Sequence, residues 1–452
     1  MITRGGRFVH AALAASLLAA GCARGQTITR GPYLQSGTAT SVVVCWRADV
    51  AANGRVRYGR SPGALTGSVD AVALTRDHAV TLSGLEPGTT YWYAVETSSA
   101  TLASGAAFTF TTPPPAGAPA PIRFWVVGDS GTADGNARAV RDAYDAYSAG
   151  TQTNFWIMLG DNAYDTGTEA EVQRAVFETF AEPLRRSVLW SAFGNHDGYS
   201  SNAGRNSGPY FDAFVFPKNG EAGGVPSGTE AYYSFDVANV HLVSLDAYGS
   251  SRLPGSPMLR WLEEDLAATR QPWIVAFWHH PPYTKGTHDS DTETELVEMR
   301  RYAVPILETA GVDLVLGGHS HVYERSFLID GHYGTSDTFA PSMKKDGGSG
   351  RPGDTGAYWK PAGRTPHAGT VYVVLGSSAK KGNGPLNHPA MAASRSGLGS
   401  LVVDVSQDRL DAVFLRETVA VTDAFTVVKS RHRRLPGSAA PADAPVHLGR
   451  GR

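Results

Sequence analysis

The sequence predicts an α/β layered domain that follows a smaller all-β domain. From residue 27 to residue 112, short β-rich runs are broken by Gly and Pro, and no stretch keeps helical periodicity for three turns. Residues 113–121 read PPPAGAPAP, which predicts a semi-rigid linker. Between residues 122 and 430, buried-strand patterns alternate with helical patterns, the arrangement typical of layered α/β domains.

Composition excludes several classes of protein. The chain has 452 residues, with 40 Lys and Arg against 42 Asp and Glu, so it has no basic excess that would indicate a nucleic-acid-binding surface. Only two cysteines are present, Cys22 and Cys45, which excludes a disulfide scaffold and a metal site made of thiolates. Nothing in the sequence indicates an oligomeric state.

The N-terminus has the pattern of an export signal. Arg4 and Arg7 precede an apolar run over residues 8–20, which is shorter than the roughly 20 residues of a bilayer span. The run ends in LAAGC at Cys22, which resembles a bacterial lipoprotein processing box. We expect residues 1–22 to be a signal peptide and the protein to be a periplasmic or cell-envelope lipoprotein whose lipid anchor is its only membrane contact. Plain cleavage, which would give a secreted protein, is the alternative.

In the first domain, two strands show a buried face. Val42, Val44 and Trp46 alternate along one run, and Tyr91 and Tyr93 along another. The segment 84–93, GLEPGTTYWY, resembles the corner between the fifth and sixth strands of fibronectin type III domains, which implies a sandwich around Trp46. This domain carries no cluster of ligand-binding residues, so it could serve as a spacer or a packing partner.

The second domain contains five apolar runs that predict buried strands, at residues 122–127, 155–159, 188–193, 273–278 and 312–316. Ser256 and Pro257 predict the start of a helix with Leu259, Leu262 and Leu266 in register, and Val172, Val176 and Phe180 mark another helix. Further β runs are expected at 232–235, 240–245, 371–375 and 401–405. The basic, Pro/Ala-rich tail at 431–452 is predicted to be disordered.

Polar side chains able to bind metal follow each of the five strands. They are Asp129; Asp161 and Tyr164; Asn195 and His196; His279 and His280; and His319 and His321. Loops beyond the carboxyl ends of strands converge in open α/β sheets, so these five loops are predicted to share one crevice. Trp278, Tyr283 and Tyr323 are expected to line its walls, and His280 is expected only to pack in its loop.

The residue types select the cofactor. Two carboxylates, several imidazoles, a phenol and an amide, without a thiolate, suit a pair of ions such as iron, zinc or manganese. Asp161 has two oxygens and can bridge two cations roughly 3.5–4 Å apart. Taken singly, each motif is equally typical of an ordinary polar turn. The ordered set of five motifs together is not typical of ordinary turns.

This ordered set looks like the motif set of the metallophosphoesterases, and Tyr164 places it with the purple acid phosphatases, whose plant-type members also carry a fibronectin-like N-terminal domain. The resemblance implies a layered sandwich of two mixed sheets flanked by helices. It further implies one ion, commonly ferric iron, and a second ion of iron, zinc or manganese. The first ion would be held by Asp129, Asp161, Tyr164 and His321, and the second by Asp161, Asn195, His279 and His319.

Two histidines receive catalytic roles from the resemblance. His288, nine residues after His279, is expected to contact substrate or act as general acid, with a plain exposed histidine as the alternative. His196 would stabilise phosphoryl oxygens or assist proton transfer. An acidic residue that orients this histidine in plant enzymes would correspond to Asp165, one position closer in this chain.

The predicted function is hydrolysis of small phosphate monoesters, with metal-bound hydroxide attacking phosphorus in line and an acid pH optimum. Two alternatives remain at this stage. The same metal frame serves phosphodiesterases and nucleotidases, because the ligands fix the reaction class and the crevice walls fix the leaving group. A surface binding module with an inert site is the other alternative.

Overall fold

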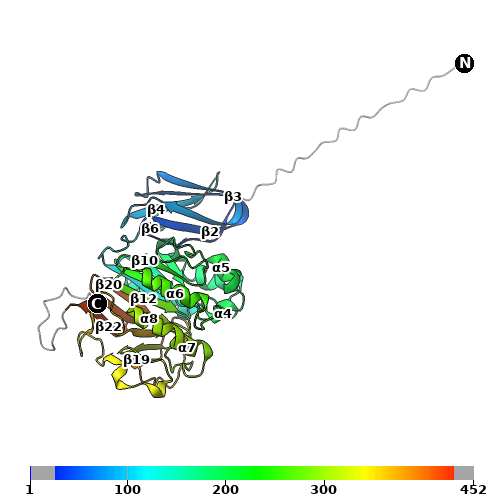
Figure 1. The fold of residues 1–452 in the computed structure, drawn as a ribbon. Helices are drawn as coiled ribbons and strands as arrows, with labels where there is room; N and C mark the ends of the chain where they lie inside the picture. Colours follow the sequence, from blue (N-terminus) through cyan, green and yellow to red (C-terminus); the bar gives the residue numbers. More distant parts are fainter. Residues whose placement is uncertain (2–25, 99, 432–452) are drawn as a thin grey trace.

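One all-β region and one layered α/β region make up the computed structural model, which describes residue 1, residues 26–98 and residues 100–431. Residues 2–22 of the predicted signal peptide, with Cys22, and residues 432–452 of the predicted tail lie outside the described residues. Figure 1 shows the all-β region stacked on one end of the α/β region. None of the helices in the described part of the chain has the length and apolar character that crossing a bilayer requires.

The all-β region is one continuous antiparallel sheet. Its strands are β1 (Ile28–Gln35), β2 (Ser41–Gly59), β3 (Gly67–Ser83), β4 (Thr90–Glu96), β5 (Thr101–Ala103) and β6 (Thr109–Thr111). The first part of the long β2 pairs with β1 and its last part pairs with β4, so all six strands form one hydrogen-bonded sheet. The pairing of β2 with β3 has register shifts between Arg47 and Gly54. Trp46 is buried as predicted and stacks on His78, with ring centroids 4.4 Å apart.

The α/β region contains two seven-stranded mixed sheets, as the fold prediction required. The first has the order β17-β22-β21-β20-β7-β8-β9, and β7 (Ile122–Val127), β8 (Phe155–Met158) and β9 (Val188–Ser191) are parallel. The second has the order β10-β11-β12-β13-β18-β14-β19, and β11 (Val240–Ser244), β12 (Trp273–Trp278), β13 (Leu314–Gly317) and β18 (Val371–Leu375) are parallel.

The remaining strands are β10 (Tyr233–Val237), β14 (Tyr323–Ser326), β15 (Leu328–Ile329), β16 (Lys344–Asp346), β17 (Tyr358–Pro361), β19 (Met391–Arg395), β20 (Gly399–Ser406), β21 (Arg409–Arg416) and β22 (Val421–Ser430). The α-helices are α1 (Gly135–Tyr147), α2 (Glu169–Val172), α3 (Ala181–Arg186), α4 (Asn195–Gly198), α5 (Pro209–Ala213), α6 (Pro257–Ala268), α7 (Thr294–Glu298) and α8 (Val304–Ala310). In the described part of the chain, the π-helical segments are η1 (Gln173–Glu178) and η3 (Met299–Ala303), and the 3₁₀ turns are η2 (Ala203–Arg205), η4 (Ser336–Thr338) and η5 (Pro341–Met343).

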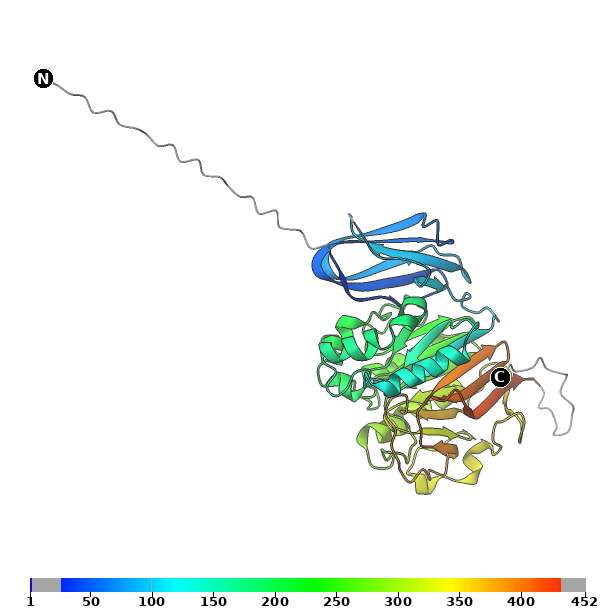
Figure 2. The same cartoon turned by 180° about the vertical axis from the view of Figure 1, so that it is seen from behind.

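Aromatic side chains pack the two sheets face to face. The rings of Trp190 and Phe235 stack with centroids 3.8 Å apart, and Tyr323 stacks on Phe414 at 4.1 Å. Helices α6 and α8 lie on the near side of the sheets in Figure 1, and Figure 2 shows the same body from behind. All five predicted buried strands are present in the structure, within a few residues of the expected bounds.

Both predicted helical segments form, but one has a different geometry. Helix α6 begins as predicted, with Ser256 as its cap and Pro257 in its first turn. Around Val172 and Val176 the chain passes from α2 into the π-helical segment η1 and then into α3. The side chains of Val172, Val176 and Phe180 are all buried, because the wider turn changes the backbone hydrogen bonds without moving these residues off the apolar face.

Candidate metal centre

The predicted site residues lie where the parallel strands of both sheets end. β7, β8 and β9 lead into the loops of Asp129, Asp161 and Asn195, and β12 and β13 lead into the loops of His279 and His319. Asp129, Asp161 and His319 adopt positive φ angles of 54°, 51° and 65°. A non-glycine residue in this conformation costs on the order of 1–3 kcal/mol, and such strained residues are typical of functional sites. The strained backbone at these three positions therefore supports a functional site at the strand ends.

One set of side chains converges on the phenol of Tyr164. Its oxygen lies 2.9 Å from Oδ1 of Asp129, 2.9 Å from Oδ2 of Asp161 and 3.5 Å from Nε2 of His321. Nε2 of His321 also lies 3.5 Å from Oδ1 of Asp129. Four of the predicted ligands, from three different loops, therefore present their donor atoms to one point.

A second set converges on Nε2 of His279. This nitrogen lies 3.0 Å from Oδ1 of Asn195, 3.3 Å from Oδ1 of Asp161 and 3.3 Å from Nδ1 of His319. The other ring nitrogen of His279 donates to the carbonyl of Leu159 at 2.8 Å, so Nε2 is the nitrogen that a cation would bind. The structure thus brings together all seven predicted ligands, and Asp161 contributes one oxygen to each set.

The two sets fit a pair of cations. Atoms that share an ion at roughly 2.0–2.2 Å lie about 3 Å apart, as the donor atoms do here. His319 directs its second ring nitrogen to Oε2 of Glu293 at 3.2 Å, an outer contact that metal-binding histidines commonly make. Two close-lying groups of His and Asp donors, His279 with His280 and His319, and Asp129 with Asp161 and His279, are buried. Neither set of described side chains contains a cysteine, which favours iron, zinc or manganese over softer ions.

The electrostatics of the site also favour added positive charge. Burial, together with the carboxylates of Asp129 and Asp161, raises the pKa of Tyr164 well above its ordinary value. Burial would lower the pKa of His279, but the same carboxylates raise it to about 9. The phenol and the imidazole hold their protons because negative charge surrounds them, and a cation at either point would displace those protons.

His196 lies at the edge of the first set. Its backbone N–H donates to Oδ1 of Asp161 at 2.9 Å, and its ring makes an edge contact with the Tyr164 ring at 4.5 Å between centroids. Asp165 contacts the ring of His196 through its backbone carbonyl and not through the carboxylate that the resemblance implied, since its position is one residue closer. The carboxylate of Asp197 orients the surrounding loop instead, accepting from the Gly194 N–H at 3.0 Å.

His288 lies beside the second set, with Glu293 as its partner. Nδ1 of His288 donates to Oε2 of Glu293 at 2.9 Å, and the rings of His288 and His319 lie 3.7 Å apart. Burial alone would raise the pKa of Glu293, but hydrogen bonds from these two histidines hold it below its ordinary value. Glu293 therefore holds both rings in place. It was not predicted, because no strand ends at it and its spacing matches no motif.

Three aromatic predictions were wrong. Trp278, Tyr283 and Tyr323 are fully buried and line no open crevice. The hydroxyl of Tyr283 donates to the carbonyl of His332, and that of Tyr323 to Asp423 at 2.8 Å, so both side chains hold core contacts. The exposed Tyr199 instead contacts the ring of His196, at 5.1 Å between centroids. His280 is buried against His319, with ring centroids 4.3 Å apart, closer to the centre than predicted.

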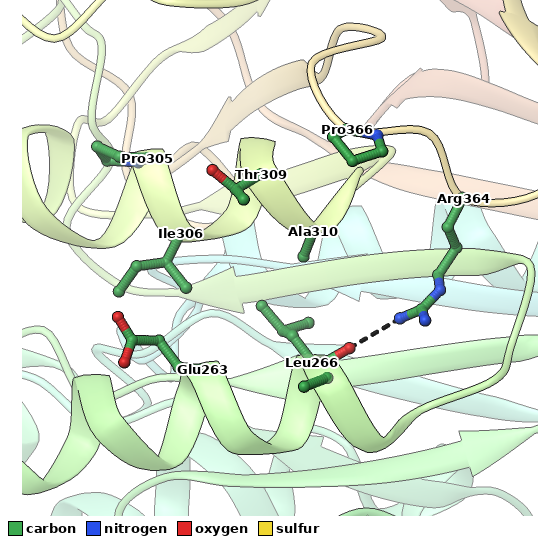
Figure 3. Close-up of a pocket in the computed structure, with 9 residues that line it drawn as sticks. Glu263, Leu266, Pro305, Ile306, Thr309, Ala310, Arg364 and Pro366 are labelled. Atoms are coloured by element: carbon green, nitrogen blue, oxygen red, sulfur yellow. Dashed lines mark hydrogen bonds between the residues drawn. The ribbon is translucent and has the colours of Figure 1, made fainter.

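A cavity of about 570 Å³ lies elsewhere, between α6 and α8. Figure 3 shows Leu266 and Ile306 facing across it and the guanidinium of Arg364 donating to the carbonyl of Leu266, at 2.7 Å. Its lining is mostly apolar and contains none of the predicted ligands. The convergent polar chemistry of the described residues is therefore at the strand ends, not in this cavity.

The chain is similar to known phosphoesterases in both of its regions. Residues 122–323 match the calcineurin-like phosphoesterase family, and residues 30–112 match the purple acid phosphatase N-terminal domain. The probable purple acid phosphatase 20 of Arabidopsis thaliana is 29% identical over 310 residues, covering 62% of this chain and 65% of that protein. Purple acid phosphatase 22 of Arabidopsis thaliana is 28% identical over 297 residues, covering 60% of each.

The chain spans less than two thirds of the length of these curated relatives. A solved purple acid phosphatase from yellow lupin (Lupinus luteus) seeds superposes with a TM-score of 0.62 over 88% of this chain and 75% of that one. Its sequence is 16% identical, so this comparison shows a common fold.

Proposed function

The chain is a calcineurin-like metallophosphoesterase with a purple acid phosphatase N-terminal domain, and from this premise we propose that it hydrolyses phosphate monoesters at a dinuclear metal centre. The observation that carries the proposal is that the two carboxylate oxygens of Asp161 face different ligand sets. Oδ2 lies by Tyr164, and Oδ1 lies by His279. A carboxylate placed in this way can bridge two ions.

Asp129, Asp161, Tyr164 and His321 would hold one ion, for which we propose ferric iron because a phenol is among the donors. Asp161, Asn195, His279 and His319 would hold the other, as iron, zinc or manganese. When bound, such a pair supplies Lewis acidity, which neutralises phosphoryl charge and activates water for in-line attack.

Side chains of the protein would carry out proton transfer and contact the phosphoryl group. His288 is held through Nδ1 by Glu293, which leaves Nε2 to carry a proton toward a leaving alkoxide. Its side chain keeps 31% of its exposure, so a substrate can reach it. His196 is positioned by its backbone contact with Asp161 to donate to a phosphoryl oxygen.

The test compares two substrates on metal-replete protein between pH 4 and pH 8. We expect turnover of p-nitrophenyl phosphate with an acid optimum and much slower turnover of bis-p-nitrophenyl phosphate. Turnover of the diester alone would assign a phosphodiesterase. Turnover of neither ester, with metal bound, would favour a binding module.

A substitution of the shared carboxylate tests the centre itself. In Asp161→Asn we expect metal content to fall at both positions and the rate to fall by at least about 100-fold, with an unchanged circular dichroism spectrum. Tyr164→Phe should remove the visible absorbance of the oxidised protein if ferric iron is bound beside the phenol. A colourless wild-type protein with two bound ions would contradict the iron assignment.

The cellular location of the protein is a separate proposal. We propose export with lipid attachment at Cys22, on the strength of the leader pattern alone. Wild-type protein should then sediment with membranes and Cys22→Ser protein should not. Equal release of both proteins would contradict lipidation.

A further inference from the structure

A lysine lies against the face of the phenol in the first ligand set. Nζ of Lys380 is 3.4 Å from the centroid of the Tyr164 ring. That phenol oxygen lies 2.9 Å from both Asp129 and Asp161, so the ammonium group stands beside the centre. The side chain of Lys380 is half-buried, whereas Lys381 is exposed.

The loop that carries Lys380 is fixed to the loops of the centre. The Ser378 N–H donates to the carbonyl of Gly128 at 3.0 Å, and the Gly382 N–H donates to the carbonyl of His321 at 2.8 Å. A Cβ atom at Gly382 would lie 2.0 Å from Cγ2 of Thr287, so a larger residue there would have to push Thr287 aside. Lys380 is therefore held at the centre by backbone contacts on both sides of it.

The ammonium group lacks an anionic partner. Across residues 26–98 and 100–431, no Asp or Glu forms an ion pair with Lys380, whereas Lys285 pairs with both Asp289 and Asp291. A half-buried cation beside two metal ions would be repelled by them. An anion that lies between the lysine and the ions removes this repulsion, and a phosphoryl group is such an anion.

We infer that Lys380 binds a phosphoryl oxygen of the substrate on the Tyr164 side of the centre and so favours dianionic monoesters over monoanionic diesters. This inference rests on the proposed function. It adds a residue of this chain that selects the charge state of the substrate, beside the roles proposed for His196 and His288.

Binding of inorganic phosphate tests the inference without any turnover. Metal-loaded wild-type protein, Lys380→Met, Lys380→Gln and Lys381→Met are titrated with phosphate in a calorimeter, after metal content and melting temperature have been measured. Both Lys380 variants should bind phosphate about tenfold more weakly, and Lys381→Met should stay within about twofold of wild type. The ratio of kcat/KM for the monoester to that for the diester should fall by a similar factor in the Lys380 variants alone, and Lys380→Arg should restore most of it.

Phosphate affinity that is unchanged in the Lys380 variants, or lowered equally in Lys381→Met, would overturn the inference. Loss of metal in both Lys380 variants would assign a structural role to the contact with Tyr164 and overturn it as well. If the wild-type protein hydrolyses neither ester, the proposed function fails, while the phosphate titration still decides the role of Lys380.

Discussion

Glu293 is a residue whose role in positioning two histidines could not be predicted from motif spacing. Its carboxylate contacts His288 and His319, which are 31 residues apart along the chain and stand in two different loops. The seven candidate ligands could be picked out from the sequence because each follows a strand end or a recognisable motif. Glu293 and Lys380 could not, because their importance comes from side-chain contacts between loops, which no spacing along the sequence encodes.

Substitution of Glu293 should therefore impair the rate more than substrate binding. In Glu293→Gln we expect kcat to fall about 10–100-fold with little change in KM, because the amide no longer fixes both imidazoles. The acid limb of the pH profile should move as well. Glu293→Asp, which keeps the charge, should recover part of the rate. A variant that keeps the wild-type profile and rate would show that Glu293 positions neither histidine.

His241 gives a residue-scale prediction far from the centre. It is fully buried, and its two ring nitrogens lie 2.8 Å from carboxylates of Asp236 and Asp265. Burial would lower the pKa of His241, but these two hydrogen bonds raise it to about 9. The pKa is thus higher in the folded state than the ordinary value of about 6.5. The protonated ring stabilises the fold fully below pH 6.5, and this stabilisation is lost as the pH rises toward 9.

We expect the free energy of unfolding of the wild-type protein to fall between pH 6.5 and pH 9 by more than that of His241→Gln. Urea denaturation at several pH values measures this difference. Parallel pH profiles for the two proteins would show that the ring is neutral in the folded state.

At the scale of elements, glycine at the strand ends serves mainly to let loops approach one another. A Cβ at Gly194 would lie 2.1 Å from the amide nitrogen of Asp161, although Gly194 has an ordinary φ. Among the four described glycines that directly precede a candidate ligand, Gly128, Gly160, Gly194 and Gly318, only Gly160 combines a close approach, 2.7 Å from Nδ1 of His279, with a positive φ of 90°. The glycines before four of the motifs are visible in the sequence. Which loops they allow to approach could not be predicted, since this depends on the packing of two sheets.

Gly160→Ala should therefore damage both the fold and the centre. We expect a loss of about 1–3 kcal/mol in the free energy of unfolding and weaker retention of metal, because the new methyl group displaces His279. Gly135→Ala is the matched control, since a Cβ there meets nothing within 4 Å and the residue opens α1. Chemical denaturation of both variants measures the loss of stability, and metal analysis measures how much metal each retains. Equal behaviour of the two variants would contradict the packing argument.

The helical segment from α2 to α3 marks the limit of periodicity as a predictor. Val172, Val176 and Phe180 correctly indicated a buried helical face, and all three are buried. The π-helical turn η1 within it could not be predicted, because the spacing of apolar residues is compatible with both geometries over so short a stretch. Gln173 at the start of η1 accepts from Arg30 of the first domain at 3.0 Å, so the irregular segment lies at a domain contact.

For the whole molecule, the question left open by the sequence was whether the first domain is a spacer or a packing partner. The side chain of Gln35, at the end of β1, is fully buried. Its amide donates to the carbonyl of Leu189 at 3.2 Å and accepts from the Val215 N–H at 3.1 Å. The hydroxyl of Tyr33 donates to the carbonyl of Ala213 at 2.7 Å. Leu189 belongs to β9, the strand that leads to Asn195, so the first domain braces the scaffold of the candidate centre.

From this contact we expect the two domains to unfold in a single cooperative transition. Gln35→Leu should lower the free energy of unfolding by about 1–3 kcal/mol, because Leu189 and Val215 each lose a buried hydrogen-bond partner. Gln152→Leu, at an exposed loop position, should change it by less than about 0.5 kcal/mol. Scanning calorimetry of the three proteins measures both effects. Two separate transitions in the wild-type protein would mean that the domains are stable independently, and a neutral Gln35→Leu would mean that these hydrogen bonds do not couple them.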